Sequence, residues 1–431
     1  MSAPVQPRPF NPDAARAEMA ADPRELAARR QPGMSLEAPF YISPEFFDLD
    51  IDAIFAKSWI FVANEAEIPE AGDYVVIDIG RYLVIVARDD DEKVAAYHNV
   101  CRHRGARILN DACGSVGRIV CGYHQWTYDM NGSLVFADAQ AEDFDKSCFV
   151  LRKVQVRSVA GLIFLCISDR TPPDFDEVVA TVEPYLAPHR LAEAKVAAQI
   201  DLIENGNWKL TMENNRECYH CAGGHPELLE SYFPVYGFDL DDIPARLIPA
   251  RDRYLAAIKD LEDTCDALNL PYAEIEDLDD RPTGFRIMRE PLEKAGESFT
   301  PDGTAAVKKL MAGFPTARLG RNSMHLQPNF WCHFMADHAI TFSAIPIAPD
   351  KTLLRTTWLV HPDAVEGVDY DLDELTWAWN ATNRQDSTFV ERAHRGVLNP
   401  AYVPGPYAPS EYQVDAFINW YIQRIREHLA E

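Results

Sequence analysis

The sequence predicts an α+β protein with two domains, an antiparallel β domain followed by a larger domain that mixes helices with strands. Short β-rich runs separated by Gly, Asp and Asn turns fill residues 46–170. Further β-rich runs at 342–347 and 353–359 flank a Pro-Asp-Lys turn and predict a hairpin. Residues 375–393 carry apolar side chains at helical spacing, which predicts a long helix.

The chain divides into three segments. Residues 1–45 alternate polar helical stretches with Pro-containing breaks, and predict an N-terminal arm that packs on a larger body. Residues 46–170 form the predicted β domain, and residues 171–431 form the predicted α+β domain after a Thr-Pro-Pro join. The strands expected in the β domain span residues 74–79, 82–87, 94–100, 118–122 and 162–167.

Composition excludes several classes of protein. The 431 residues carry a formal net charge of −26. A strongly negative surface repels phosphate backbones and anionic headgroups, so we expect neither nucleic-acid nor membrane-surface binding. No apolar run approaches the ~20 residues of a membrane span, and we recognise no secretory signal. Nine cysteines argue against a disulfide framework and favour a reducing, cytoplasmic compartment.

The strongest chemical signal is a pair of short motifs in the predicted β domain. Cys101-Arg-His103 is followed by Cys121-Gly-Tyr-His124, so each of two loops carries one thiol and one imidazole. Two cysteines on one iron and two histidines on the other form the ligand set of a Rieske [2Fe–2S] centre. A Cys₂His₂ zinc site is the alternative, but the helical His-x₃₋₅-His arm is missing. We therefore expect an iron–sulfur cluster.

A second constellation lies at the start of the α+β domain. His220 and His225 are five residues apart, so an unbroken helix would aim their imidazoles in different directions. Gly223 and Gly224 can end the helix, and Pro226 can begin the next one, so both histidines can converge on one metal. Two histidines and one carboxylate form the facial triad of non-haem Fe(II) oxygenases, which leaves positions open for O₂ and substrate.

The long C-terminal helix offers the third ligand. A lone carboxylate on an apolar helix face is costly unless it is paired or metal-bound. Asp386 is such a carboxylate, and we predict that it completes the triad. The stripe that contains it has spacings of four or three residues and comprises Leu375, Trp379, Thr382, Asp386, Phe389 and Ala393.

At these motifs the chain resembles the oxygenase components of Rieske non-haem iron oxygenases. Residues 101–106 and 121–132 resemble the Rieske motif, although Gly122 and Gln125 stand where many members have Pro and Gly. Residues 207–226 resemble the mononuclear iron motif, and the Gln-Asp pair at 385–386 resembles the segment that carries the third iron ligand. The resemblance implies a Rieske β domain joined to a helix-grip-like catalytic domain.

The resemblance also implies roles for residues and partners. Glu217 occupies the position of an acid, often Asp, that connects the mononuclear iron's histidine to a Rieske histidine of a neighbouring subunit. Family members are commonly trimers, and a separate flavin and iron–sulfur reductase supplies electrons from NAD(P)H. The chain has no dinucleotide-binding fingerprint, which agrees with a separate reductase. An acidic surface would suit a reductase with a basic docking face.

Residues 213–221 and 358–371 resemble the subgroup that oxidises N-methyl groups of betaines such as glycine betaine and stachydrine. This resemblance implies hydroxylation of an N-methyl group and release of formaldehyde. A quaternary ammonium group cannot donate a hydrogen bond, so aromatic faces should surround it. The resemblance does not identify the particular betaine or the group that binds its carboxylate. It also does not distinguish a trimer from a hexamer. The candidate aromatic residues are Tyr219, Phe330, Trp331, Phe334 and Trp379.

Two other functions remain possible at this level. An aromatic-ring-hydroxylating oxygenase would use the same two iron centres. A non-catalytic Rieske electron carrier would lack the triad. The Cys218-x-x-Cys221 motif is interpreted as two small buried thiols on a helix and not as a redox pair, because no thioredoxin-like βαβ pattern surrounds it.

Overall fold

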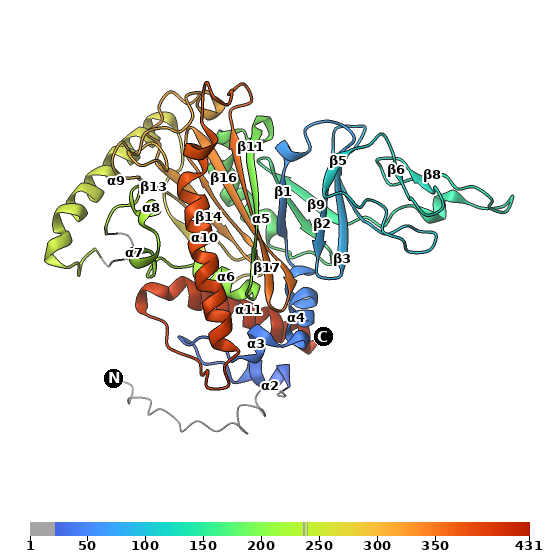
Figure 1. Cartoon of the computed structure of the whole chain (residues 1–431), viewed down its shortest axis with the longest axis horizontal. Helices are drawn as coiled ribbons and strands as arrows, with labels where there is room; N and C mark the ends of the chain where they lie inside the picture. Colours follow the sequence, from blue (N-terminus) through green and yellow to red (C-terminus); the bar gives the residue numbers. More distant parts are fainter. Residues whose placement is uncertain (1–21, 236–237, 239) are drawn as a thin grey trace.

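The computed structural model describes residues 22–235, 238 and 240–431. Residues 1–21 of the expected N-terminal arm lie outside the described residues. Figure 1 shows a large part built on a sheet crossed by helices, from which a smaller β-rich part extends to the right. The α+β class and the order of the two domains are confirmed.

The β domain consists of three small antiparallel sheets. Their strand orders are β4-β3-β2-β5, β6-β7-β8 and β1-β10-β9. The strand expected at 118–122 is only two residues long, because Cys121 already turns into a loop. The strands are β1 (Ile60–Asn64), β2 (Asp73–Ile79), β3 (Tyr82–Arg88), β4 (Val94–His98), β5 (Cys113–Ser115), β6 (Ile119–Val120), β7 (Thr127–Tyr128), β8 (Leu134–Phe136), β9 (Gln155–Val159) and β10 (Leu162–Cys166).

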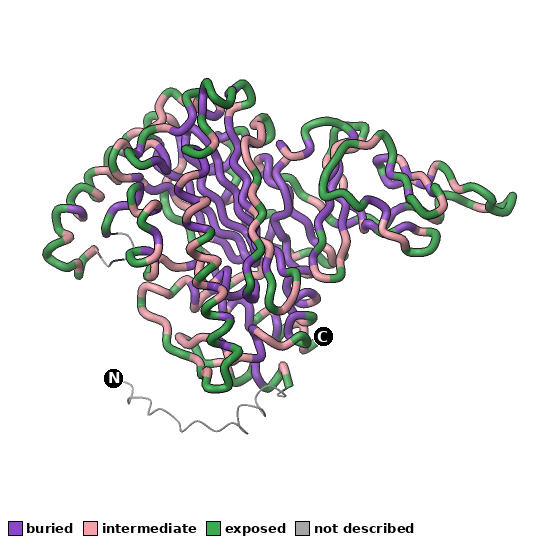
Figure 2. The backbone as a smooth tube through the Cα atoms, in the orientation of Figure 1, coloured by how far each residue is buried: buried purple, intermediate pink, exposed green. Residues whose placement is uncertain are grey.

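A seven-stranded antiparallel sheet forms the centre of the larger domain, in the order β11-β17-β16-β15-β14-β13-β12. The predicted hairpin is present as β16 and β17. Figure 2 shows that the buried backbone is concentrated in these central strands. The strands are β11 (Lys195–Glu204), β12 (Ile275–Asp277), β13 (Phe285–Glu290), β14 (Arg321–Leu326), β15 (Phe330–Phe334), β16 (His338–Ala348) and β17 (Lys351–Val360).

Helices cover both faces of this sheet. The predicted long helix is α10, whose N-terminus is capped by the Asp371 carboxylate. Helix α10 contacts β11, α6 and α8, and Asn383 Nδ2 donates to Thr356 Oγ1 of β17 at 2.9 Å. The helices of this domain are α5 (Phe175–Leu186), α6 (Trp208–Asn215), α7 (Cys221–Gly224), α8 (Pro226–Leu229), α9 (Ile248–Leu268), α10 (Leu372–Val397) and α11 (Tyr412–Ala430).

The apolar stripe of α10 differs from the predicted one at its C-terminal end. Ala393 is exposed, and the buried positions of the last turns are Val390, His394 and Val397. Leu375 and Ala393 are 18 residues apart, which is five turns of an ideal helix, so they point in the same direction. The last turns of α10 instead pack against Gly206 through Val390 and His394, which lie on a different side of the helix from Ala393.

The described part of the N-terminal arm contains α2 (Pro23–Ala28) and α3 (Pro39–Ile42), and α2 packs against α11. Helix α4 (Pro44–Asp50) begins at the end of the arm. Asp50 is fully buried at this junction. Its carboxylate pairs with the Lys209 ammonium and accepts hydrogen bonds from Trp208 Nε1 at 2.8 Å and the Tyr421 hydroxyl at 2.6 Å. The ion pair and the tyrosine hydrogen bond therefore join the end of α4 to α6 and α11.

The two faces of the seven-stranded sheet point into different cores, because successive side chains of a strand alternate. On β15, Phe330, Cys332 and Phe334 face a core shared with β10 and α5. Trp331 lies in the other core, on the face that α10 covers. Among the described residues, no helix has the length and apolarity needed to cross a bilayer.

Candidate metal centres

The two Rieske-motif loops have matching backbone conformations. The Cys101 carbonyl accepts a hydrogen bond from the Gly105 N–H at 3.0 Å, and the Cys121 carbonyl accepts one from the Gln125 N–H at 3.0 Å. Gly105 and Gln125, each four residues after its cysteine, have φ values of 76° and 59°. This left-handed conformation lets each loop fold back toward its own cysteine, and it is costly for a residue with a Cβ such as Gln125.

The four side chains of these loops come together at one end of the β domain. The thiols of Cys101 and Cys121 are buried, whereas His103 is exposed and His124 is half-buried. The imidazole rings of the two histidines lie 4.6 Å apart between centroids. His103 also stacks on Trp126, at 4.8 Å. The buried thiols and outward histidines match a cluster whose histidine-bound iron faces the surface.

The chemistry of this donor set fits an iron–sulfur cluster. Burial raises the pKa of the Cys121 thiol, so without a metal this thiol would remain protonated. A bound metal deprotonates its thiol ligands, and thiolate with imidazole suits iron. The Tyr128 hydroxyl accepts from the Arg102 N–H at 3.0 Å and lies 3.5 Å from Cys101 Sγ. It is therefore placed to donate to a thiolate.

A second site forms where α10 meets α7 and α8. His220 Nε2 lies 2.9 Å from His225 Nε2 and 3.2 Å from Asp386 Oδ1, and His225 Nε2 lies 2.9 Å from the same oxygen. Two ligands at about 2.1 Å from a metal and 90° apart are separated by about 3.0 Å. These three atoms therefore fit one triangular face of an octahedral metal site.

The local backbone brings the two histidines together. Helix α7 is a single turn that ends at Gly224, and Pro226 begins α8, so His225 lies at the junction. A Cβ at position 224 would come within 2.8 Å of the Phe389 ring on α10. Glycine at this position therefore allows α7 to approach α10 closely enough for both histidines to reach Asp386.

Each histidine is oriented by a partner on its other ring nitrogen. His220 Nδ1 contacts Glu217 Oε1 at 2.5 Å. His225 Nδ1 contacts Gln385 Oε1 at 2.8 Å, and Gln385 Nε2 donates to Glu227 Oε2 at 2.8 Å. Such partners fix which nitrogen faces the metal. The roles of Gln385 and Glu227 were not predicted, because nothing in their spacing signals a contact with His225.

Electrostatics couple the triad strongly. Burial lowers the pKa of His220, but hydrogen bonds to Asp386 and Glu217 outweigh it and raise the pKa to about 9. Burial raises the pKa of Asp386, and its hydrogen bonds to His220 and His225 outweigh this and lower it. In the metal-free protein these hydrogen bonds favour protonated imidazoles beside an ionised Asp386 carboxylate. Metal binding would release protons, since histidine ligands must be neutral.

Two of the five predicted aromatic residues, Trp331 and Trp379, lie in the core on the sheet face that α10 covers. Trp379 precedes Asp386 by two turns of α10, roughly 10 Å along the helix axis. Its ring stacks with His333 at 4.6 Å and contacts Phe342 at 5.0 Å. Trp331 stacks on Phe342 at 5.0 Å. Trp331, His333, Phe342 and Trp379 are hereafter called the aromatic cluster.

The other three aromatic candidates lie elsewhere. Phe330 packs against Phe61 at 4.5 Å on the opposite face of the sheet, and Phe334 lies on that face against His189. Their placement follows from strand alternation, which separates them from Trp331. Tyr219 is 69% exposed, so it lies on the surface. The structure therefore does not bring these three residues together with Trp331 and Trp379.

The interpretation of Cys218 and Cys221 as separate thiols was also wrong. The structure joins them by a disulfide, with Cα atoms 5.0 Å apart. The Cys221 N–H donates to the Cys218 carbonyl at 3.2 Å, and this turn brings the two side chains together. The other seven cysteines are free. The disulfide encloses Tyr219 and His220.

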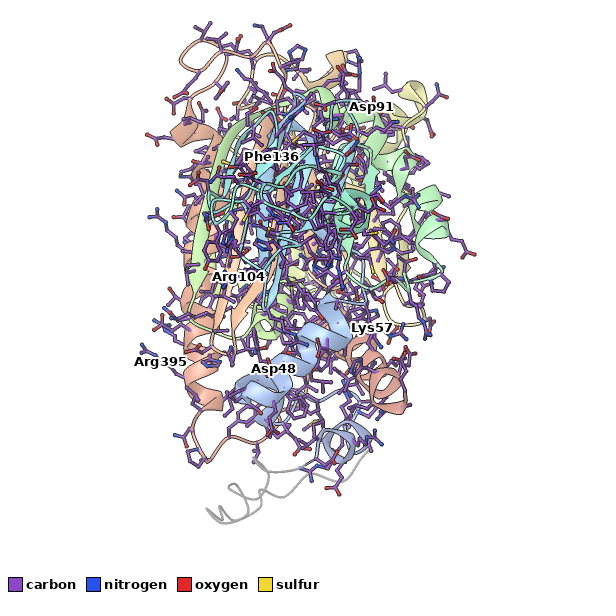
Figure 3. The ribbon with its side chains drawn as sticks, turned by 90° about the vertical axis from the view of Figure 1, so that its right-hand side faces the viewer. Asp48, Lys57, Asp91, Arg104, Phe136 and Arg395 are labelled. Carbon is purple, nitrogen blue, oxygen red and sulfur yellow. A yellow bond between two sulfur atoms is a disulfide. The ribbon has the colours of Figure 1, made fainter. Side chains whose placement is uncertain are left out.

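The two metal centres lie far apart within one chain. In Figure 1, β6 and β8 of the cluster-bearing part lie at the right, and α7 lies on the left, beyond the central sheet. Figure 3 views the molecule from its cluster-bearing end, where Arg104 and Phe136 are labelled. Phe136 is 48% exposed there. This end therefore presents the first loop and an apolar side chain to the outside.

The fold and both sites define the class of protein. The Rieske [2Fe-2S] domain family matches residues 58–156, and the ring-hydroxylating alpha subunit (catalytic domain) family matches residues 191–427. The chain belongs to the ring-hydroxylating alpha subunits, the oxygenase components of Rieske oxygenases. Such a subunit combines a [2Fe–2S] cluster with a mononuclear iron.

Within this family, the chain is similar over most of its length to oxygenase subunits named for quaternary ammonium substrates. The chain is 41% identical to the glycine betaine monooxygenase oxygenase subunit of Chromohalobacter salexigens, over 92% of this chain and 87% of that one. It is 40% identical to the corresponding Pseudomonas aeruginosa subunit, over 94% and 92% of the two chains. A quaternary ammonium Rieske monooxygenase solved with gamma-butyrobetaine has the same fold, with a TM-score of 0.67 at 20% identity, over 94% and 99% of the chains.

Proposed function

We propose that this chain is the oxygenase component of a two-component monooxygenase that removes an N-methyl group from a glycine betaine-like substrate. The observation that carries the proposal is the identity of about 40%, over nearly the whole chain, to two glycine betaine monooxygenase oxygenase subunits. One atom of O₂ enters an N-methyl C–H bond and the other leaves as water, with two electrons and two protons supplied. The resulting hemiaminal collapses to formaldehyde and a tertiary amine.

Seven residues hold the two metal groups in this proposal. The mononuclear iron, when bound, supplies the O₂ chemistry, and the cluster supplies electrons one at a time. The mutual distances of 2.9 to 3.2 Å among the ligand atoms support the triad. The cluster ligands are Cys101, His103, Cys121 and His124, and the triad is His220, His225 and Asp386.

The aromatic cluster binds the ammonium end of the substrate. A desolvated quaternary ammonium is attracted to aromatic faces, and Trp331 and Trp379 are both buried. His333 supports this role, because burial and, second, the Arg321 guanidinium lower its pKa well below the usual range. Its imidazole is therefore neutral and does not repel a cation. The position of Trp379, two turns from Asp386 on the same helix, supports a binding surface near the triad.

Electrons arrive from NAD(P)H through a separate flavin and iron–sulfur reductase. The cluster of one subunit then serves the mononuclear iron of the next, in a homotrimer. The separation of the two centres in Figure 1 supports this arrangement, as do the exposed His103 and the surface position of Tyr219 beside Glu217. A solved relative is described as revealing inter-subunit electron transfer. The proposal places the protein in the cytoplasm, where NAD(P)H is available.

The test is a substrate screen with a surrogate reductase. Purified protein is supplied with NADH and O₂, and formaldehyde is measured for glycine betaine, its longer homologues and stachydrine. We expect one formaldehyde per NADH with at least one betaine. Monocyclic and bicyclic aromatic substrates serve as the comparison set. Hydroxylated aromatic products without formaldehyde would identify a ring-hydroxylating oxygenase, and cluster reduction without any product would identify an electron carrier.

A further inference from the structure

Arg216 differs from the other buried cations on the α10 side of the catalytic sheet. Its side chain lies at the end of α6 and is fully buried, with the residue 2% exposed. Nη1 donates to Asn215 Oδ1 at 2.6 Å and Nη2 to Gln327 Oε1 at 3.0 Å. Among the described residues it has no carboxylate partner, whereas Lys209 pairs with Asp50. Burial lowers the pKa of Arg216 to about 9.

Unused hydrogen-bonding atoms surround this guanidinium. Arg216 Nε has no partner in the described part of the chain, and neither has Gln327 Nε2 or His325 Nδ1. Gln327 is 1% exposed and His325 is 9% exposed. Burying a cation without a carboxylate partner is costly, and so is burying a polar nitrogen without a hydrogen-bond partner. These three neighbouring nitrogens without a partner therefore indicate a missing polar ligand, and the positive charge of Arg216 indicates an anion.

The position of His325 connects this group to the substrate site. His325 of β14 is paired in register with Trp331 of β15, and Trp331 with Phe342 of β16, so the three side chains lie in one row across the same face. Trp331 and Phe342 belong to the aromatic cluster. Burial is the largest cause of the lowered pKa of His325, and the positive charge of Arg216 is the second. The two side chains are therefore close. Along the chain, Arg216 directly precedes Glu217, the partner of His220.

We propose that Arg216, with Gln327 and His325, binds the carboxylate of the substrate. This inference rests on the proposed betaine N-demethylation. A trimethylammonium group offers no hydrogen bond, so an aromatic surface alone cannot choose which end of a betaine points toward the iron. A guanidinium can bind a carboxylate by two parallel hydrogen bonds, which orients the molecule. The site then distinguishes a betaine from choline, which has the same ammonium group and a hydroxyl in place of the carboxylate.

The experiment compares Arg216→Met with a matched control, Arg289→Met. Arg289 is another buried arginine, 5% exposed, without a carboxylate partner among the described residues. It shares its sheet face with Phe285 and Ile287 of β13, opposite the aromatic cluster. Both variants remove a buried guanidinium, so both should lower thermal stability. Visible circular dichroism of the cluster verifies that each variant is folded, and Arg216→Lys, which keeps the charge, tests for partial rescue.

The readouts are the Kd for glycine betaine and for choline, by calorimetry on the holoenzyme without reductase, and KM for formaldehyde release. We expect Arg216→Met to weaken betaine binding by at least about 30-fold and to change choline binding less than about 3-fold. Arg289→Met should change neither. Arg216→Lys should fall between Arg216→Met and the wild type.

An unchanged Kd for betaine in Arg216→Met would overturn the carboxylate site, since ordered water alone would then satisfy these groups. Equal losses for betaine and choline would also overturn it, because they would show only a structural role. The proposed function fails separately, when the wild type releases no formaldehyde from any betaine.

Discussion

Asp386 Oδ1 on α10 lies 2.9 Å from His225 Nε2 at the junction of α7 and α8. The contact joins the longest helix of the described chain to the shortest pair of helices in the catalytic domain. It exists because glycine at position 224 leaves room for the Phe389 ring. The triad depends on the close approach of α7 to α10. His220 and His225 are near each other in the sequence, whereas Asp386 is distant in the sequence and is brought to them by this packing.

Replacing Asp386 with Ala should abolish substrate oxidation and lower the mononuclear iron content at least about 10-fold, because two histidines alone hold the metal weakly. The cluster should keep the electron paramagnetic resonance signal of its reduced state. Iron analysis, that spectrum and formaldehyde release are the measurements. Glu391→Ala is the control on the same helix, since Glu391 pairs with Arg395 of that helix. Normal turnover in Asp386→Ala would remove this residue from the triad.

Replacing Glu217 with Gln should lower turnover about 10- to 100-fold, the usual effect of losing the partner of a metal-bound histidine. Its carboxylate contacts His220 Nδ1, and in the proposed trimer it also faces a neighbouring cluster. Iron content should stay near that of the wild type, while the reduced cluster reoxidises more slowly with substrate and O₂. Glu230→Gln is the control, because Glu230 pairs with Lys294. A wild-type reoxidation rate would contradict the bridging role.

Trp331 and Phe330 are adjacent in sequence and lie on opposite faces of β15, which makes them a matched pair. Trp331→Leu should raise KM for a betaine about 10- to 30-fold, because a desolvated cation–π contact is worth about 2 kcal/mol. Phe330→Leu should lower the unfolding temperature and leave KM unchanged. Steady-state kinetics and thermal unfolding are the measurements. Equal effects on KM would mean that the aromatic cluster does not bind the ammonium group.

Glu204 should make the protein less stable as pH rises. Its carboxyl group is fully buried, and one oxygen accepts from the Thr211 hydroxyl at 2.5 Å. Burial, with a smaller repulsion from Asp386, raises its pKa from 4.5 to about 7. Between these values the unfolded chain has lost the proton and the folded chain keeps it. The free energy of unfolding therefore falls by up to about 1.4 kcal/mol per pH unit in this window.

Glu204→Gln should remove this dependence, so its stability relative to the wild type should increase from pH 5 to pH 8. Urea midpoints measured at unit pH intervals test the prediction. Glu142→Gln, at an exposed loop position, is the control. Parallel pH profiles for the wild type and Glu204→Gln would show that Glu204 ionises normally.

The net charge of −26 should govern association with the reductase. Salt shortens the Debye length from about 10 Å at 0.1 M to about 3 Å at 1 M, so attraction to a basic docking face weakens. We expect KM for the reductase to rise several-fold between these salt concentrations. Single turnover of protein already reduced by dithionite should change little. A KM for the reductase that is independent of salt would exclude electrostatic docking.

The sequence by itself determined the fold class, and it predicted the four cluster ligands and the three residues of the triad. Cys101 with His103, and Cys121 with His124, are neighbours in the chain, and so are His220 and His225. Local spacing therefore carries their chemistry. Asp386 lies far along the chain from these histidines. It was predicted as the third ligand because a carboxylate within the apolar stripe of a helix is costly unless it is paired or metal-bound. The long helix and the hairpin were also predicted, since their periodic patterns extend over many residues.

Only the tertiary structure decided which neighbours of these motifs reach the site. Composition could not tell Trp331 from Phe330, because the face that a residue occupies depends on strand register. Nor could it show that Tyr219 is exposed or that Cys218 is bonded to Cys221. Arg216 and His325 come from a helix end and a distant strand, and the nitrogen that each leaves without a hydrogen-bond partner is apparent only in the folded chain. These contacts depend on how helices and strands pack against each other, and a local sequence pattern does not predict that packing.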